Sequence, residues 1–104
     1  MLTQVSILHH DYPSQVRDQV DEKLKHLTRF SERIVSLRAL LERQREEHRV
    51  EIVASVGHGA VLVADARHLS FGPALDEALS RMEGLLKRHN QKLTQERRRG
   101  HRRT

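Results

Sequence analysis

The amino-acid sequence predicts an α+β domain with the element order β-α-β-β-β-α, in which a four-stranded sheet carries both helices on one face. Two observations support this fold class. Residues 3–8, 34–41 and 49–56 alternate apolar with polar side chains, as half-buried strands do, and residues 60–66 are rich in β-branched and small residues. Residues 16–27 and 75–93 instead place apolar side chains at the spacing of amphipathic helices. A chain of 104 residues has room for one small domain of this kind.

The first strand and the first helix follow each other directly. Val5 and Ile7 point to one side of residues 3–8, and the polar residues between them point to the other. Residues 11–14 supply turn residues and a proline that suits the first turn of a helix. The apolar residues that then recur at helical spacing are Val16, Val20, Leu24 and Leu27. A helix is therefore predicted to run to about Arg29.

Three strands are predicted next, over residues 34–41, 49–56 and 60–66. The residues predicted to share the inner face of the first two are Val35, Leu37, Ala39 and Leu41, then Val50, Ile52, Ala54 and Val56. Gly57-His58-Gly59 predicts a tight hairpin turn, because glycine tolerates the positive φ angles of such turns. The charged residues 42–48 are predicted to form a longer, exposed hairpin loop.

A second helix is predicted from Pro73 to Lys92 or a few residues beyond. Its apolar side is formed by Leu75, Ala78, Leu79, Met82, Leu85, Leu86, His89 and Leu93. No repeat or linker interrupts the chain. We therefore expect one domain over residues 1–95 and a basic, flexible C-terminal tail over residues 96–104.

The distribution of charge predicts a polyanion as partner. The net charge is +5, but residues 85–104 hold eight Lys and Arg side chains against the single acid Glu96. Residues 1–84 are nearly balanced. A balanced domain with one cationic end is typical of proteins that bind nucleic acid.

Basic side chains along the last helix form a line on one side of it. At about 100° per residue, Arg81, Arg88 and Lys92 fall within roughly 40° of one another, and Arg99 would join them in a longer helix. We expect this line to contact RNA phosphates. Charge alone adds further candidates in the same segment and at the acid-free end of the first helix, and these are Lys25, Lys87, Arg97 and Arg98.

Several other functions are not expected from this composition. Without cysteine there is no disulfide and no thiolate chemistry. The eight histidines lack metal-ligand spacing, and neither a phosphate loop nor a carboxylate pair suggests an enzyme. We therefore expect no catalysis, cofactor, metal or small-molecule substrate. No signal peptide or membrane span is predicted, so a cytoplasmic protein is expected.

The aromatic residues bear on how RNA could be recognised. Tyr12, Phe30 and Phe71 are the three aromatic residues, and none lies on a predicted strand. Modules that read single strands stack bases on sheet aromatics. We therefore expect recognition to rest on charge, backbone and shape.

Taken in order along residues 2–93, several segments resemble a known family. They are 16–17, 20, 23–24, 27 and 29–30 in the first helix, 50–54, 57–59 and 61–64 in the central hairpin, and 74–76 and 81–83 in the last helix. These segments resemble the short ribosome hibernation-promoting factors and ribosome-associated translation inhibitors, also called sigma-54 modulation proteins. The sequence departs from the family pattern at Ser70, Gly72 and Gly84. Gly84 also costs about 1 kcal/mol relative to alanine in a helix interior.

The resemblance implies binding to rRNA of the small ribosomal subunit, in the channel for messenger and transfer RNA, with inhibition of translation or ribosome hibernation under stress. The positions that match the family's basic helix residues by type are Arg17, Lys23, Arg29, Arg81, Arg88 and Lys92. Because the chain ends at Thr104, we expect no C-terminal dimerisation domain and a monomer in solution.

Two alternatives remain open at the level of sequence. The first is a general module for double-stranded or structured RNA that has no preference for ribosomes. The arginine-rich tail favours it, because such a tail attracts many polyanions. The second is a protein-binding transcription regulator, which would keep its activity after removal of the C-terminal charges.

Overall fold

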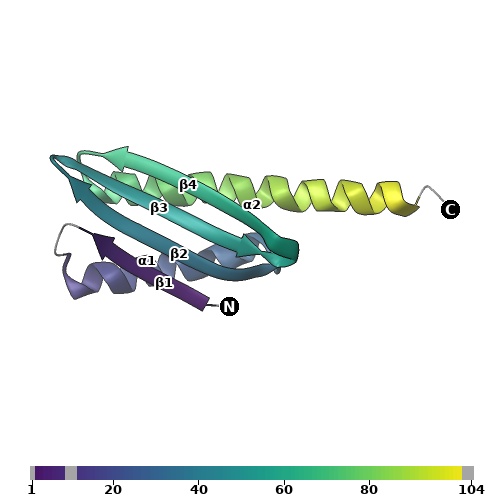
Figure 1. The fold of residues 1–104 in the computed structure, drawn as a ribbon, viewed down its shortest axis with the longest axis horizontal. Helices are drawn as coiled ribbons and strands as arrows, with labels where there is room; N and C mark the ends of the chain where they lie inside the picture. Colours follow the sequence, from purple (N-terminus) through teal and green to yellow (C-terminus); the bar gives the residue numbers. More distant parts are fainter. Residues whose placement is uncertain (1, 9–11, 102–104) are drawn as a thin grey trace.

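The computed structural model describes residues 2–8 and 12–101, with the side chains of His58 and residues 93–101 excepted. Its elements are β1 (Leu2–Leu8), α1 (Ser14–His26), the 3-10 turn η1 (Leu27–Phe30), β2 (Ile34–Gln44), β3 (Glu47–Val56), the 3-10 turn η2 (Gly57–Gly59), β4 (Ala60–His68) and α2 (Phe71–His101). The predicted order β-α-β-β-β-α is confirmed (Figure 1).

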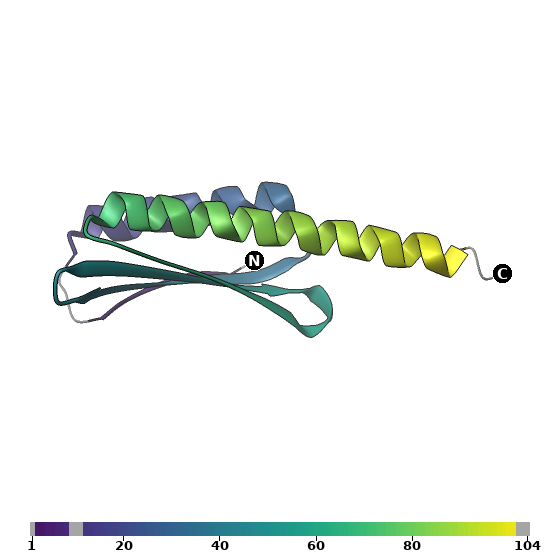
Figure 2. The same cartoon turned by 90° about the horizontal axis from the view of Figure 1, so that it is seen from above.

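The four strands form one sheet in the order β1-β2-β3-β4. β1 runs parallel to β2 because α1 carries the chain back across the sheet between them, whereas tight turns make the β2–β3 and β3–β4 pairs antiparallel. Both helices lie on the same face of the sheet (Figure 2). The predicted fold class is therefore confirmed, and the other face of the sheet is left without a helical cover.

The core lies between the sheet and the two helices. Leu37, Leu41 and Ile52 are fully buried on the inner face of the sheet. Residues from both helices meet them there, and the fully buried ones are Val20, Leu24, Ala74, Ala78, Met82 and Leu86. The alternation of β3 and the helical spacing of α2 thus predicted the core side of both elements correctly.

Val35 is not on the inner face, so its predicted place in the core is wrong. Ile34 pairs with Val56 and Ser36 with Ser55, which leaves Val35 as the extra residue of a β-bulge. The bulge shifts the alternation by one residue at the start of β2. Ile34 is therefore 9% exposed, whereas Val35 is 59% exposed.

The predicted exposed loop over residues 42–48 is also wrong. β2 continues to Gln44, β3 begins at Glu47, and only Arg45 and Glu46 turn the chain between them. Arg45 takes the positive φ of 56° that a tight hairpin turn requires. Within this extension, Glu42 lies on the outer face of the sheet, where it is only 6% exposed and pairs with Arg49 at 3.5 Å.

The ends of both helices differ from the predicted ones. α1 ends at His26 and tightens into η1, which ends at Phe30, so the chain to Arg29 is not one continuous α-helix. α2 runs past Lys92 to His101 and extends beyond the ends of the strands (Figure 1). A flexible tail from residue 96 stays a prediction. No helix in the described part of the chain is long and apolar enough to cross a membrane.

Replacing Gly84 with Ala should stabilise the domain by about 1 kcal/mol, because glycine weakens a helix interior. A Cβ at this position would meet only the Arg88 guanidinium at 4.0 Å, which is ordinary contact. Denaturant unfolding measures the change. Gly59→Ala is the opposite control: with φ at +83° it should destabilise by about 1–2 kcal/mol. A destabilised Gly84→Ala variant would contradict the prediction.

Candidate RNA interface

Two of the predicted RNA-binding arginines each donate a hydrogen bond to a backbone carbonyl of an edge strand. β1 and β4 are the edge strands. Arg17 of α1 donates a hydrogen bond of 2.9 Å from Nη1 to the carbonyl of Val5 in β1. Arg81 of α2 donates in the same way from Nη1 to the carbonyl of Asp65 in β4. Covering edge groups in this way opposes pairing with a foreign strand, so both arginines have a structural role.

Arg81 also takes part in a network of hydrogen bonds and ion pairs beside β4. Its Nη2 pairs with one carboxylate oxygen of Glu77, and the other oxygen pairs with Nε2 of His68. The hydrogen bond from His68, followed by the charge of Arg81, lowers the pKa of Glu77 below its ordinary value. This network connects α2 to the edge strand β4.

Three predicted lysines form ion pairs on the surface. Nζ of Lys23 lies 3.5 Å from Asp76 across the two helices, Nζ of Lys25 lies 3.0 Å from Asp21, and Nζ of Lys87 lies 3.0 Å from Glu83. All three lysine side chains are about half exposed. Such pairs contribute little to stability, so these lysines can exchange their partners for phosphate at small cost.

Arg29, Arg88 and Lys92 form the group of exposed candidates that pair with no acid among the described side chains. Arg97, Arg98 and Arg99 lie on the last turns of α2, and their side chains fall outside the described residues. Among the predicted RNA-binding residues with described side chains, the cations that can bind phosphate without breaking an ion pair are thus one in η1 and two on α2.

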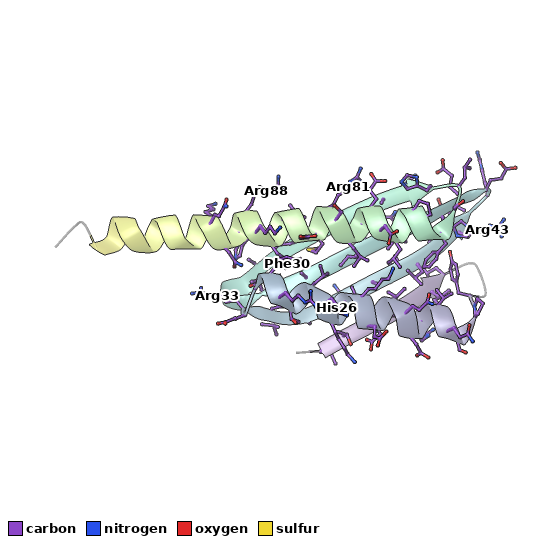
Figure 3. All side chains as sticks on the ribbon, turned by 180° about the vertical axis from the view of Figure 1, so that it is seen from behind. His26, Phe30, Arg33, Arg43, Arg81 and Arg88 are labelled. Atoms are coloured by element: carbon purple, nitrogen blue, oxygen red, sulfur yellow. The ribbon has the colours of Figure 1, made fainter. Side chains whose placement is uncertain are left out.

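The structure divides the predicted basic surface into two flanks of α2. Arg81 and Arg88 lie along the flank next to β4, where they border a shallow hollow with Val63. His26 and Phe30 lie on the opposite flank, on the segment that carries Lys23 and Arg29 (Figure 3). Ser80 of α2 borders both the shallow hollow and a groove on the opposite flank, so it lies between the two flanks. A ligand that met both sets of cations would therefore lie across α2.

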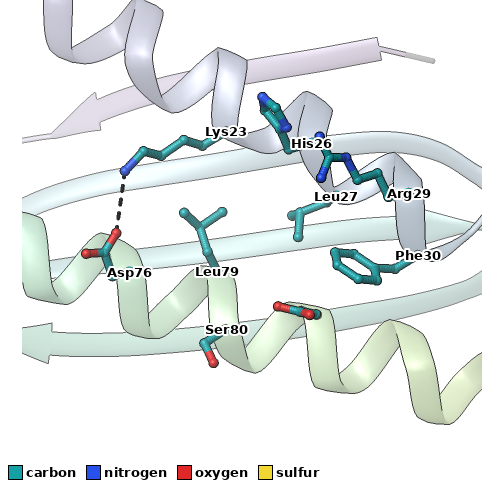
Figure 4. A pocket seen from close by; sticks show the side chains of 9 residues that line it. Lys23, His26, Leu27, Arg29, Phe30, Asp76, Leu79 and Ser80 are labelled. Atoms are coloured by element: carbon teal, nitrogen blue, oxygen red, sulfur yellow. Dashed lines mark hydrogen bonds and ion pairs between the residues drawn. The ribbon is translucent and has the colours of Figure 1, made fainter.

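A groove of about 380 Å³ separates α1 and η1 from α2. Lys23 reaches across it to Asp76, and the ring of Phe30 points into it beside Leu79 (Figure 4). The sequence did not single out this groove, because its two walls lie about fifty residues apart in the chain.

The outer face of the sheet carries an excess of acid around Arg49. The arginine Nε and Nη2 lie 3.0 and 2.8 Å from Asp65, Nη2 lies 2.7 Å from Glu51, and Nη1 lies 3.5 Å from Glu42. The hydrogen bonds to Asp65 raise the pKa of Arg49. Three carboxylates around one guanidinium make this part of the outer face a poor surface for a polyanion, and the helix layer is the candidate interface.

The sequence reasoning missed one cluster of cations at the β2–β3 turn. Arg43, Arg45 and Arg67 border a hollow there together with Glu46 and Glu47. Only the extension of β2 and β3 into the predicted loop brings these residues beside β4. The interleaved acids offset the charge, so the cluster adds little to a phosphate surface. In the described part of the chain, no group of three or more His, Asp or Glu side chains is placed to hold a metal.

The fold and the cations of its helix layer define the chain as a small basic α+β domain with one open sheet face. The chain belongs to the family described as sigma 54 modulation protein / S30EA ribosomal protein, whose model matches residues 3–94. The family predicted from the resemblance is therefore confirmed.

Relatives match over nearly the full length. The chain is 32% identical over 91 residues to the ribosome hibernation promoting factor of Azotobacter vinelandii, and the aligned region covers 86% of this chain and 84% of that protein. It is 26% identical over 92 residues to the ribosome hibernation promoting factor of Pseudomonas putida, which covers 88% of this chain and 89% of that protein.

Two solved structures share the fold. The Protein Y N-terminal domain of Thermus thermophilus superposes with a TM-score of 0.73 at 22% identity, over 83% of this chain and 94% of that domain. A ribosomal subunit interface protein from Coxiella burnetii gives a TM-score of 0.75 at 15% identity, over 86% and 98% of the two chains.

Replacing Glu77 with Gln should lower stability near neutral pH and have little effect in acid. The folded state lowers the pKa of this carboxyl, so its contribution is present above the ordinary value of 4.5 and is lost as the pH falls through the lower, folded value. Unfolding of wild type and variant at about pH 6 and about pH 3 measures this. Glu46→Gln, at the exposed hairpin turn, is the control. An equal deficit at both pH values would contradict the prediction.

Proposed function

We propose that this protein is a ribosome hibernation factor that binds rRNA of the small subunit through its helix layer, in the channel for messenger and transfer RNA. The observation that carries the proposal is the match to the hibernation promoting factors of Azotobacter vinelandii and Pseudomonas putida along almost the whole domain. The exposed cations of the helix layer support it.

The proposed contacts are electrostatic and fall into three groups. Arg29, Arg88 and Lys92 are exposed without a described acidic partner, so phosphate binding breaks no ion pair. Lys23 and Lys87 first release Asp76 and Glu83. Arginine adds bidentate geometry toward phosphate oxygens, and the long lysine side chains adapt to the RNA backbone. Arg97, Arg98 and Arg99 add attraction at the end of α2.

Inhibition follows from occupancy and needs no reaction. A rigid domain seated in the channel excludes messenger and transfer RNA, and its release restores the ribosome. The proposal therefore includes no catalytic step, cofactor or small-molecule substrate. It places the protein in the cytoplasm with the ribosome, acting as a single copy of the domain.

Reversing charge at Arg88 and Lys92 together should reduce affinity for small subunits by at least about tenfold per residue and leave the fold intact, because both side chains are exposed. Co-sedimentation with purified subunits over a range of salt measures this. The log–log salt slope should fall by about 0.7–0.9 for each phosphate that the variant no longer neutralises.

The matched control reverses Arg38 and Arg67, which are also exposed but lie on the outer face of the sheet. This variant should bind as wild type does. If both double variants bind equally well, the helix layer is not the interface.

Deleting residues 97–104 should weaken ribosome binding without abolishing it, because the domain keeps Arg29, Arg88 and Lys92. Affinity measured by co-sedimentation at two salt concentrations tests this, and the reduction should be largest at low salt. Complete absence of binding would contradict the prediction and would show that the last turns of α2, and not the rest of the helix layer, bind the ribosome.

Competition with unrelated duplex RNA separates the proposal from a general RNA-binding module. A ribosome-specific factor should remain on the small subunit when bulk duplex is added in excess. A general module would be displaced in proportion to the phosphate supplied. A protein that never co-sediments with ribosomes but retains its activity after charge reversal would instead support a protein-binding regulator.

A further inference from the structure

The groove between the two helical segments has a composition that differs from the basic surface around it. At about 380 Å³ it lies at the lower end of the roughly 300–1,000 Å³ typical of small-molecule sites. Its floor is apolar, and the residues that form it are Leu27, Phe30 and Leu79. Its walls are polar: η1 contributes Arg29, and α2 contributes Asp76, Ser80 and Glu83.

The two carboxylates are the unexpected part of this lining. On a surface that meets phosphates, Asp76 and Glu83 oppose binding by charge repulsion. Their pairs with Lys23 and Lys87 are open to solvent, with Asp76 70% and Glu83 38% exposed, so the pairing contributes little. A carboxylate only accepts hydrogen bonds, which makes it suited to a ligand that presents N–H donors.

The apolar floor suits a flat ring, and its aromatic member is held in place from two sides. Asn90 of α2 donates a hydrogen bond to the carbonyl of Phe30. Nζ of Lys87 lies 5.1 Å from the centre of the Phe30 ring, in a cation–π contact. Arg29 extends near the same end of the groove and offers a planar guanidinium on which a base can stack (Figure 4).

We propose that this groove receives one unstacked guanine base of the bound RNA. The proposal rests on the proposed function and names the recognition that occurs at the same surface. Guanine presents two adjacent N–H donors, N1–H and the 2-amino group, and Glu83 accepts both. The ring lies on Leu79 and Phe30, and the phosphates on either side of the base meet Arg29 and Lys87.

The other bases fit the groove less well. Uracil carries one N–H donor between two carbonyl oxygens, and a carboxylate repels those oxygens. Adenine and cytosine each present a single amino group beside an acceptor nitrogen. A free phosphate is disfavoured by Asp76 and Glu83. Among the described residues, no strand of the sheet carries a Phe, Tyr or Trp on which a base could stack. The groove therefore supplies the base selectivity that the sheet does not.

A guanine-specific glyoxal reagent, which modifies N1 and N2 of unpaired guanine, tests the proposal on small subunits saturated with the full chain. Wild type should reduce modification of one rRNA guanine at least tenfold. Two variants should leave that guanine reactive while they are bound. Ser80→Trp fills the groove from an exposed position, and Glu83→Gln keeps the side-chain volume but removes the second acceptor. Each should also weaken binding about tenfold.

Gln4→Trp is the matched control, because Gln4 is exposed on the outer face of the sheet, away from both the groove and the helix layer. It should protect the same guanine as wild type. Bound wild type without a protected guanine, or equal protection by all four proteins, would overturn the groove proposal and leave the proposed function standing. Failure of wild type to bind small subunits would overturn both. Glu83→Gln keeps the test valid if Ser80→Trp does not fold.

Discussion

The structure depends on one constraint: a sheet that buries a single face must find all of its apolar cover on that side. The inner residues of the strands, such as Leu37 and Ile52, are fully buried and need two helices to cover them. Each helix supplies only one apolar stripe, so the polar sides of α1 and α2 must face away from the sheet together. The candidate interface is therefore a consequence of how the core is closed.

The same constraint leaves two open sheet edges and one open sheet face, and charged side chains form contacts on each of them. Arg17 and Arg81 occupy edge carbonyls, and Arg49 gathers three carboxylates on the outer face. A ligand that binds one of these cations must first break the cation's contacts with the sheet. The charge left for recognition is the part that the fold does not use, which includes Arg29 and Arg88.

The change from α-helix to 3-10 turn at Leu27 gives the helix layer more than charge. It brings Arg29 and Phe30 alongside the middle of α2 and forms a groove with an apolar floor. Charge on the flanks and a selective groove between the helical segments would act together: the first supplies attraction that falls with salt, and the second supplies preference for a base.

The sequence by itself determined the order of the elements, the inner faces of β3 and α2, and the family, because periodicity and spacing are properties of neighbouring residues. The tertiary structure decided what depends on distant segments. It placed Val35 in a bulge opposite β3, joined Lys23 to Asp76, and turned Arg81 from a free cation into a partner of the β4 edge. A helical wheel places such a residue on a side of its helix, but only the packed neighbours determine what that side meets.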